Sequence, residues 1–556
     1  MTQGQLEGIP EGIRKAFSDL EIRIMDDIVR RIKINGFSTA TADWQLTRLQ
    51  QLGMSEADIR EWIRMTLEIS EKEMDRIFSD EVYKEYMGHE RAYQVNGFDQ
   101  IPFDQNQELQ STIEAVRKQT NDTFQNITNS LGFVKQDASG HIYPITLTEF
   151  YRTTLDGAML DIHSGAFDYQ TVLMRVINDM TTSGVRWIDY ASGRHNRIDV
   201  AARRAIMTGF RQVQGKINEQ VAADLGTDSY EVTYHVGARP SHQPWQGKVW
   251  TMQQLKDVCG LGTVTGLHGA NCYHDYNAFI PGISVRTYTD EQLEAMQTEE
   301  NTKKTYNGRK YTTYEALQQQ RKMERNMRKT RQDIHLMNEG EADEQSIMLK
   351  KARYQGQMQT YKDFSKKMKL PEQIDRIYQD GLKCKFMPTK AETEKANRIL
   401  QGKIEEQERQ ARQSKFSERF TEFNNGQKDT ITTRRLMNNL NKTEIGKEIV
   451  SYIVEHPNLN IQLCYKVDHE TGVRGYQDGD IIYIFASETK TVQNTAETLV
   501  HEITHHRYDI GGSQWAECVC FAQEWKHKTG KSNLTGSELK DIIKTVKELY
   551  PYLSWR

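Results

Sequence analysis

The sequence predicts a multidomain, mainly α-helical protein with a small α+β module in the middle and an α+β domain at the C-terminus. A chain of 556 residues is too long for a single hydrophobic core. Only 10 prolines and 37 glycines interrupt it, and apolar residues recur at helical spacing over most of its length. Two segments, after Tyr230 and after Gln427, instead have the β-branched residues and turn residues of short strands.

Changes in composition along the chain predict five segments. We expect an N-terminal helical domain at 1–135, a second helical domain at 136–228 and a compact α+β module with polar loops at 229–290. A basic, charged helical or linker region follows at 291–428, and the last domain occupies 429–556. In the first domain, the apolar residues at helical spacing are Ile22, Ile24, Met25, Ile28, Val29 and Ile32.

Composition excludes several classes of protein. The first residues lead into charged helical sequence, and no run of 18 or more apolar residues follows, so neither a signal peptide nor a membrane span is predicted. Six cysteines are too few for a disulfide scaffold, which favours synthesis in a reducing cytoplasm. A net charge of -4 argues against nucleic-acid binding by the chain as a whole.

The charge is nevertheless uneven, because residues 301–370 hold 17 Lys and Arg against 8 Asp and Glu. Clustered cations could contact packaged DNA or an RNA. The same charges are typical of a solvated helix pair, and no motif of a known nucleic-acid module is present, so nucleic-acid binding is a minor hypothesis. The aromatic residues interleaved with the charges are Tyr306, Tyr311, Tyr314, Tyr354, Tyr361 and Phe364.

The last domain begins with strand-forming sequence and continues with a helix. The expected strands are Ile461–Val467 and Ile481–Phe485. The helix is expected to begin near Thr491 or Asn494, because Asn494 and Glu497 have the spacing of a capping box, and to end at about Tyr508.

This helix carries the sequence His501-Glu502-Ile503-Thr504-His505. Histidines at positions i and i+4 lie on one helical face and can hold one Zn²⁺ ion, while Glu502 can act as the general base toward a water molecule there. The alternatives are a helix with surface histidines and a metal site that is only structural.

A catalytic zinc ion requires a third protein ligand. The next helix, expected to start near Ser513, offers Glu517, and Glu524 is the reserve candidate. A residue that stabilises the oxyanion cannot be chosen from the sequence, although Tyr508 and His506 are options.

The middle module is rich in polar and turn-forming residues. Histidines and cysteines gather there, and the residues in question are His242, Cys259, His268, Cys272 and His274. Their spacing matches no zinc-finger or ribbon pattern. A hydrogen-bonded structural polar cluster of His242, Cys259, Cys272 and His274 is therefore favoured over a metal site.

The order of strands, HExxH helix and glutamate-bearing helix resembles the minimal zincin fold, and the sequence WAECV at 515–519 resembles the glutamate helix of compact ImmA/IrrE-like peptidases. This resemblance covers about 100 residues. It implies a zinc-dependent metallopeptidase that cuts a peptide or protein, with His501, His505 and Glu517 as ligands and Glu502 as the catalytic residue.

A second resemblance covers roughly residues 13–370. The sequence ARPSHQPWQGK at 238–248, the sequence GLHGANCYH at 266–274 and the helical body upstream are similar to the phage minor capsid protein 2 family. That family is related in role to Mu F-like head proteins. The resemblance implies a structural protein of the virion head, encoded by a phage or prophage, synthesised in the bacterial host cytoplasm and associated with the portal and other head proteins.

Three hypotheses follow. In the first, residues 1–370 place the chain in the phage head and the C-terminal domain is carried along. In the second, the peptidase is the main activity, acting as an effector or toxin delivered with the particle or as a head-maturation protease. Mu F-like proteins carry variable C-terminal effector domains, so a fused enzyme fits both. In the third, residues 301–370 bind nucleic acid.

Overall fold

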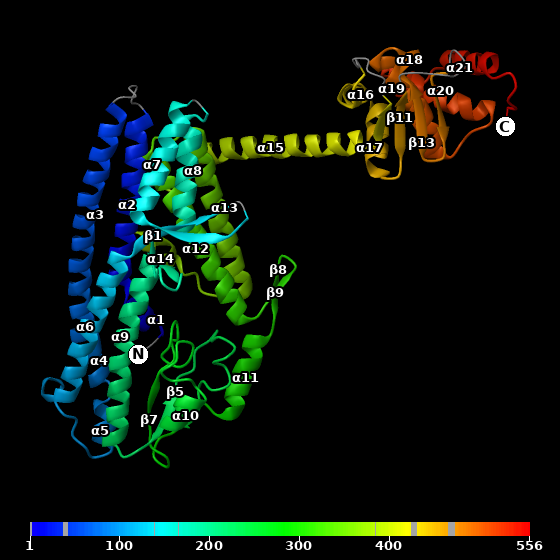
Figure 1. Ribbon diagram of the computed structural model, residues 1–556. Helices are drawn as coiled ribbons and strands as arrows, with labels where there is room; N and C mark the ends of the chain where they lie inside the picture. Colours follow the sequence, from blue (N-terminus) through cyan, green and yellow to red (C-terminus); the bar gives the residue numbers. More distant parts are fainter. Residues whose placement is uncertain are drawn as a thin grey trace. The chain divides into compact units, whose positions relative to one another are not determined.

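The computed structural model describes residues 3–36, 43–137, 139–164, 166–383, 385–423, 431–464 and 473–555. The chain forms two compact units, Met1–Ala396 and Asn397–Arg556. The predicted fold class is confirmed at the level of a mainly helical protein with several small sheets (Figure 1). Among the described residues, no helix is both long and apolar enough to cross a membrane.

The first unit is built on long helices, of which α2, α3, α6 and α9 contact one another (Figure 1). Its helices are α1 (Gln3–Gly8), α2 (Glu11–Gly36), α3 (Asp43–Arg76), η1 (Ile77–Glu81), α4 (Val82–Met87), α5 (Glu90–Val95), η2 (Phe103–Gln105), α6 (Gln107–Asn129), α7 (Leu147–His163), α8 (Tyr169–Ser183), α9 (Ile198–Asp224), α10 (Met252–Asp257), α11 (Asp290–Asn301), α12 (Thr313–Glu339), α13 (Glu344–Met368), α14 (Ile374–Ile377) and η3 (Tyr378–Asp380). The boundary between the units falls within α15 (Lys390–Ser417).

Small antiparallel sheets accompany these helices. One has the order β2-β1-β3-β4, a second the order β6-β5-β7, and β8 pairs with β9 as a hairpin. The strands are β1 (Leu131–Gln136), β2 (Ile142–Thr146), β3 (Arg186–Ile188), β4 (His195–Arg197), β5 (Ser229–Val232), β6 (Val249–Thr251), β7 (Tyr276–Phe279), β8 (Lys304–Tyr306) and β9 (Arg309–Tyr311). The β-type run expected at 230–236 is thus present as β5, which ends at Val232.

The apolar residues of α2 form the centre of the first unit. All six that the sequence places at helical spacing are buried, and all of them except Ile22 lie in one core with α6, α7, α8 and α9. Burying an apolar side chain of this size contributes about 1.5–3 kcal/mol to folding. The amphipathic pattern therefore identifies the core-facing side of α2 correctly.

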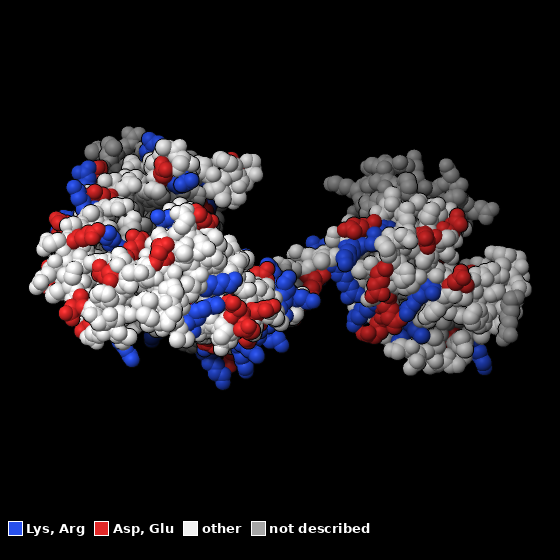
Figure 2. Space-filling view, turned by 90° about the horizontal axis from the view of Figure 1, so that it is seen from below, with Lys and Arg blue, Asp and Glu red and all other residues white. Residues whose placement is uncertain are grey.

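The basic segment also has a core, contrary to the expectation of exposed helices. Helices α12 and α13 pack against each other and bury Tyr354, Tyr361 and Phe364 between and beside them. These aromatic rings are therefore not free to stack on nucleic-acid bases. Figure 2 shows a face of the protein on which Lys and Arg side chains lie among Asp and Glu side chains. Nucleic-acid binding by residues 301–370 stays an untested prediction that rests on charge alone.

A buried carboxylate ties the middle module to the helical body. Asp275 accepts hydrogen bonds from Gln214 Nε2 at 2.6 Å and Asn218 Nδ2 at 3.0 Å, both on α9. It also contacts His268 Nε2 at 3.0 Å, within the polar loops. Burial opposes its ionisation, but His268, together with Arg211 and the backbone N–H of Tyr276, lowers the pKa of Asp275 to about 2. The loop that precedes β7 is therefore fixed directly on α9.

The second unit is a four-stranded sheet with helices packed on it. The strand order is β10-β11-β13-β12, in which β10, β11 and β13 are parallel and the edge strand β12 is antiparallel. The strands are β10 (Phe420–Phe423), β11 (Asn460–Cys464), β12 (Gly475–Asp478) and β13 (Ile481–Phe485). The helices are α16 (Thr433–Leu440), α17 (Glu444–Glu455), α18 (Ala486–Thr489), α19 (Val492–Tyr508), α20 (Gln514–Thr529) and α21 (Gly536–Leu549). Their shared core includes Ile461, Leu463, Ile482, Ile484, Leu499, Val500 and Ile503.

The two predicted strands of this unit are present as β11 and β13, although the end of the first, from Tyr465, lies outside the described residues. The predicted helix is α19, and the first of its two candidate start positions is correct. The Thr491 side chain accepts a hydrogen bond from the Asn494 backbone N–H, so Thr491 is the N-cap. The capping box of Asn494 and Glu497 is wrong, because Asn494 already lies inside the helix.

The buried carboxylate of Asp27 on α2 supplies a test of this fold. It accepts hydrogen bonds from Arg31 Nε at 2.8 Å, Ser55 Oγ of α3 at 2.9 Å and Tyr151 OH of α7 at 3.3 Å. Burial raises the pKa of Asp27, but the hydrogen bonds from Arg31 and Arg30 outweigh it and hold the pKa below its usual value.

We expect Asp27→Asn to lower the free energy of unfolding at pH 7 by about 3–5 kcal/mol, because Arg31 then stays buried with only the more distant, partly exposed Asp58 as a counter-charge. A carboxylate with a lowered folded-state pKa stabilises the fold fully above pH of about 4, and this stabilisation is lost as the pH falls further. Denaturant unfolding at several pH values measures both effects. Asp58→Asn, at a carboxylate that is 44% exposed near the same arginines, is the control and should cost less than about 1 kcal/mol. An equal loss of unfolding free energy in Asp27→Asn and Asp58→Asn would contradict this account of α2.

Candidate metal centre

The two histidines of α19 turn their rings toward each other in the interior of the second unit. His501 and His505 lie one helical turn apart, and their Nε2 atoms are 3.3 Å apart. Both residues are buried, as is Glu502 between them. The alternative of surface histidines is thereby wrong for this helix.

The outer nitrogen of each ring has a fixed hydrogen-bond acceptor. His505 Nδ1 lies 2.8 Å from the carbonyl oxygen of Ile510, and His501 Nδ1 lies 3.3 Å from Oε2 of Glu524. A carbonyl or carboxylate oxygen can only accept, so each Nδ1 carries the proton. In the neutral form of each ring, Nε2 then presents its lone pair to the space between the rings. An outer hydrogen bond of this kind is what orients histidines that bind metals.

Helix α20 brings Glu517 to the same space. Its Oε2 lies 3.3 Å from His501 Nε2, and its Oε1 lies 3.5 Å from His505 Nε2. The Oε2 atom is buried and makes no hydrogen bond of its own. Three groups that can only accept therefore converge on one point, and a proton or a metal cation is needed there. Two histidines and one glutamate are a ligand set that Zn²⁺ favours, so the residues present fit this ion.

The charges of these groups are strongly coupled. Burial lowers the pKa of His501, but the neighbouring carboxylates of Glu517 and Glu524 outweigh it and raise the pKa to about 10. Burial raises the pKa of Glu517, but the two histidines reverse this and lower it to about 2. Burial raises the pKa of Glu502, and the nearby histidines oppose that rise only in part.

One residue of this cluster was missed by the sequence analysis. Cys520 lies one turn beyond Glu517 on the same face of α20, and its sulfur lies within 4.8 Å of ligand nitrogens of both His501 and His505. The thiol is fully buried, which raises its pKa. The spacing of three residues from Glu517 was the signal that could have identified it.

The proposed oxyanion residues lie elsewhere. His506 contacts the Tyr452 hydroxyl at 2.9 Å and Asp480 Oδ1 at 3.0 Å, and Tyr508 is 48% exposed. Burial raises the pKa of the Tyr550 phenol, just after α21, and the carboxylate of Glu517 adds to this rise.

In the first unit, the structure brings together three of the four residues of the expected polar cluster. His242, Cys272 and His274 have ligand atoms within 4.8 Å of one another. Cys259 is fully buried in the apolar core around Leu255 and Leu267, to which Cys272 also belongs, but it is not part of this group of ligand atoms. His268, the further histidine of these loops, is the partner of Asp275.

Comparison with known families identifies the class of protein. Residues 1–365 match the model of the family described as phage minor capsid protein 2, and the chain belongs to this family. The matched residues include His242, Cys272 and His274 and lie within the first unit. Comparisons with curated proteins and with solved structures give no match.

The positions of Glu517 and Glu524 predict different effects on metal binding. We expect Glu517→Gln to abolish tight Zn²⁺ binding at this site, because it replaces a carboxylate that faces both Nε2 atoms. Glu524→Gln should weaken binding by only about 10–100-fold, because Glu524 contacts the outer nitrogen of His501. Zinc titration against a chromophoric chelator compares the variants. A larger loss of Zn²⁺ affinity in Glu524→Gln than in Glu517→Gln would show that the two glutamates have the opposite roles.

Proposed function

We propose that the protein is a head protein of a phage or prophage particle, associated with the portal, and that its second unit is a zinc-dependent peptidase. Family membership over residues 1–365 supports the first part. The convergence of His501, His505 and Glu517 supports the second. Because the family match ends before the second unit begins, the two parts have separate grounds.

In this proposal His501, His505 and Glu517 hold one zinc ion, and Glu524 and the Ile510 carbonyl orient the imidazoles. When bound, Zn²⁺ supplies a Lewis acid that lowers the pKa of water and polarises a peptide carbonyl. Cys520 is close enough to replace a ligand, so a structural zinc site is the second candidate role.

Glu502 is the proposed general base. It is adjacent to His501 in the chain, buried, and has a pKa raised by that burial. A carboxylate with a raised pKa accepts a proton from water and can return it to the leaving amine near neutral pH. Exclusion of bulk water strengthens each of these charge interactions.

The sheet edge beside Glu502 supports a peptide as substrate. Gly475 begins the edge strand β12, and an added Cβ there would lie 3.2 Å from Glu502 Cγ and 2.8 Å from the Tyr483 carbonyl oxygen. Only glycine fits this close approach. An extended peptide can pair with a strand edge, which would place its backbone near Glu502.

We expect Glu502→Gln to keep zinc and lose peptide cleavage by about 10²–10⁴-fold, because the amide cannot accept the proton. The measurement is the appearance of new termini by mass spectrometry after the full chain is incubated with a peptide library. Glu497→Gln, a buried glutamate on the same helix that pairs with Gln493, is the matched control and should cleave normally. Cleavage by Glu502→Gln at the parental rate would refute the assignment of the base.

The particle assignment predicts that the intact chain is found in purified virions. Quantitative mass spectrometry of gradient-purified particles should detect peptides from both units in a low, constant ratio to the portal protein. Consistent absence from particles would overturn the head-protein assignment. Presence of peptides from the first unit alone would show that the second unit is released.

A further inference from the structure

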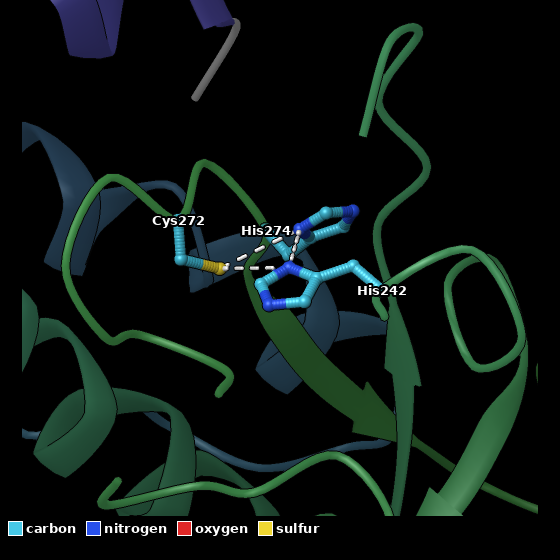
Figure 3. A group of neighbouring side chains, drawn as sticks. All are labelled: His242, Cys272 and His274. Atoms are coloured by element: carbon cyan, nitrogen blue, oxygen red, sulfur yellow. Dashed lines mark hydrogen bonds between the residues drawn. The ribbon is translucent and has the colours of Figure 1, made fainter. Parts of the chain in front are cut away.

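The loops of the middle module bring three potential ligand atoms together in the interior of the first unit. His242 Nδ1 and His274 Nδ1 are 3.4 Å apart, and Cys272 Sγ lies 3.9 Å from the first and 3.5 Å from the second (Figure 3). All three residues are buried. The side chains point toward one common centre, His242 from one loop and Cys272 and His274 from another (Figure 3).

The protonation of His242 follows from its outer contact. Its Nε2 lies 2.8 Å from the carbonyl oxygen of Thr265. That oxygen can only accept, so Nε2 carries the proton and Nδ1 of the neutral ring has a lone pair.

The protonation of His274 follows in two steps. The backbone N–H of His235 donates to Gln246 Oε1 at 3.1 Å, which fixes the amide oxygen on that side. His274 Nε2 lies 2.8 Å from the same oxygen and must therefore donate to it. Its Nδ1 then also has a lone pair, which faces the lone pair of His242.

One thiol proton cannot satisfy two facing lone pairs. Cys272 can donate to one imidazole at a time, which leaves the other nitrogen without a partner in a buried site. A cation at the centre removes this conflict, because it accepts electron pairs from both nitrogens and from the thiolate. Binding would release the thiol proton to solvent.

The distances match a tetrahedral zinc site. Zn–N bonds of 2.0–2.1 Å and Zn–S bonds of 2.3 Å place two nitrogens about 3.4 Å apart and a sulfur about 3.6 Å from each nitrogen. The observed values are 3.4, 3.5 and 3.9 Å. The three atoms therefore need to move by only a few tenths of an ångström.

The module around the cluster has little regular structure of its own. The sheet order β6-β5-β7 comprises short strands, and the loops that carry His242, Cys272 and His274 contain only the short helix α10. Small, loop-rich modules often rely on a metal ion to fix their fold. Asn271, next to Cys272, has a φ of 57°, a left-handed conformation that the loop holds at this point.

We propose that His242, Cys272 and His274 hold a Zn²⁺ ion in the part of the chain that matches the capsid family. The same three residues line a cavity of about 700 Å³, which has room for a fourth ligand. Water or an anionic group would complete the coordination. This site is independent of the peptidase proposed for the second unit.

The test uses Co²⁺ as the probe in the full chain carrying His501→Ala and His505→Ala, which removes the other histidine pair. After chelator treatment and reloading, we expect about one Co²⁺ per chain with the near-ultraviolet absorption of a thiolate ligand and the visible bands of tetrahedral Co²⁺. Adding Cys272→Ser should abolish the thiolate absorption, and adding His242→Gln should weaken Co²⁺ binding at least about 10-fold.

Cys259→Ser is the matched control, because Cys259 is a buried thiol of the same module that lies in the apolar core. It should keep the thiolate absorption. Absence of that absorption from the background protein, or its persistence after Cys272→Ser, would overturn the proposal. Since Cys272→Ser could impair folding, the thermal midpoint of the background protein is measured in parallel. Zn²⁺ should raise this thermal midpoint, and an unchanged midpoint in the presence of Zn²⁺ would also contradict the proposal.

Discussion

A neutral imidazole ring that donates its one N–H to a fixed acceptor turns the lone pair of its other nitrogen to the opposite side. This constraint governs both histidine clusters of the protein. The Ile510 carbonyl and Glu524 orient the pair on α19, and the Thr265 carbonyl and Gln246 orient the pair in the middle module. Each pair then faces inward at 3.3 or 3.4 Å. Facing lone pairs of two buried rings repel each other, and a cation or a shared proton between the rings relieves this repulsion.

The rest of each unit holds these orienting groups in place. In the second unit, the core between the sheet and α19 fixes the face on which His501 and His505 lie, and the Gly511-Gly512 turn returns the chain so that α20 presents Glu517. In the first unit, Asp275 holds the loop that carries His274 on α9 by accepting hydrogen bonds from Gln214 and Asn218. Buried polar contacts of this kind cost little when fully satisfied and a great deal when broken.

Local sequence patterns predicted the elements of the second unit well. The HExxH spacing and the start of α20 near Ser513 were sufficient to place His501, His505 and Glu517 together. The N-cap of α19 was harder to predict from the sequence, because Thr491 and Asn494 are both good N-cap residues. Only the start of the folded helix distinguishes them. The edge strand β12 was not predicted, because glycine at position 475 is typical of a turn. In the structure, the absence of a side chain at Gly475 allows its backbone to lie close to Glu502.

Tertiary contacts explain what the sequence could not reveal. The sequence grouped His242, Cys259, Cys272 and His274, but His242 lies far from Cys272 and His274 in the chain, so no ligand spacing shows which three of the four converge. Helices α12 and α13 were expected to be exposed because of their many charged residues. A count of charges, however, does not show on which face of a helix the charges lie. Their apolar face is narrow, yet it buries Tyr354, Tyr361 and Phe364.

The central claim is that each facing pair of imidazoles holds a metal ion. Elemental analysis of the purified full-length chain, after dialysis against metal-free buffer, tests it most directly. The account predicts two zinc ions per chain, one at each cluster. A chain that folds and retains only one zinc ion would contradict one of the two sites, and a folded chain without zinc would contradict both.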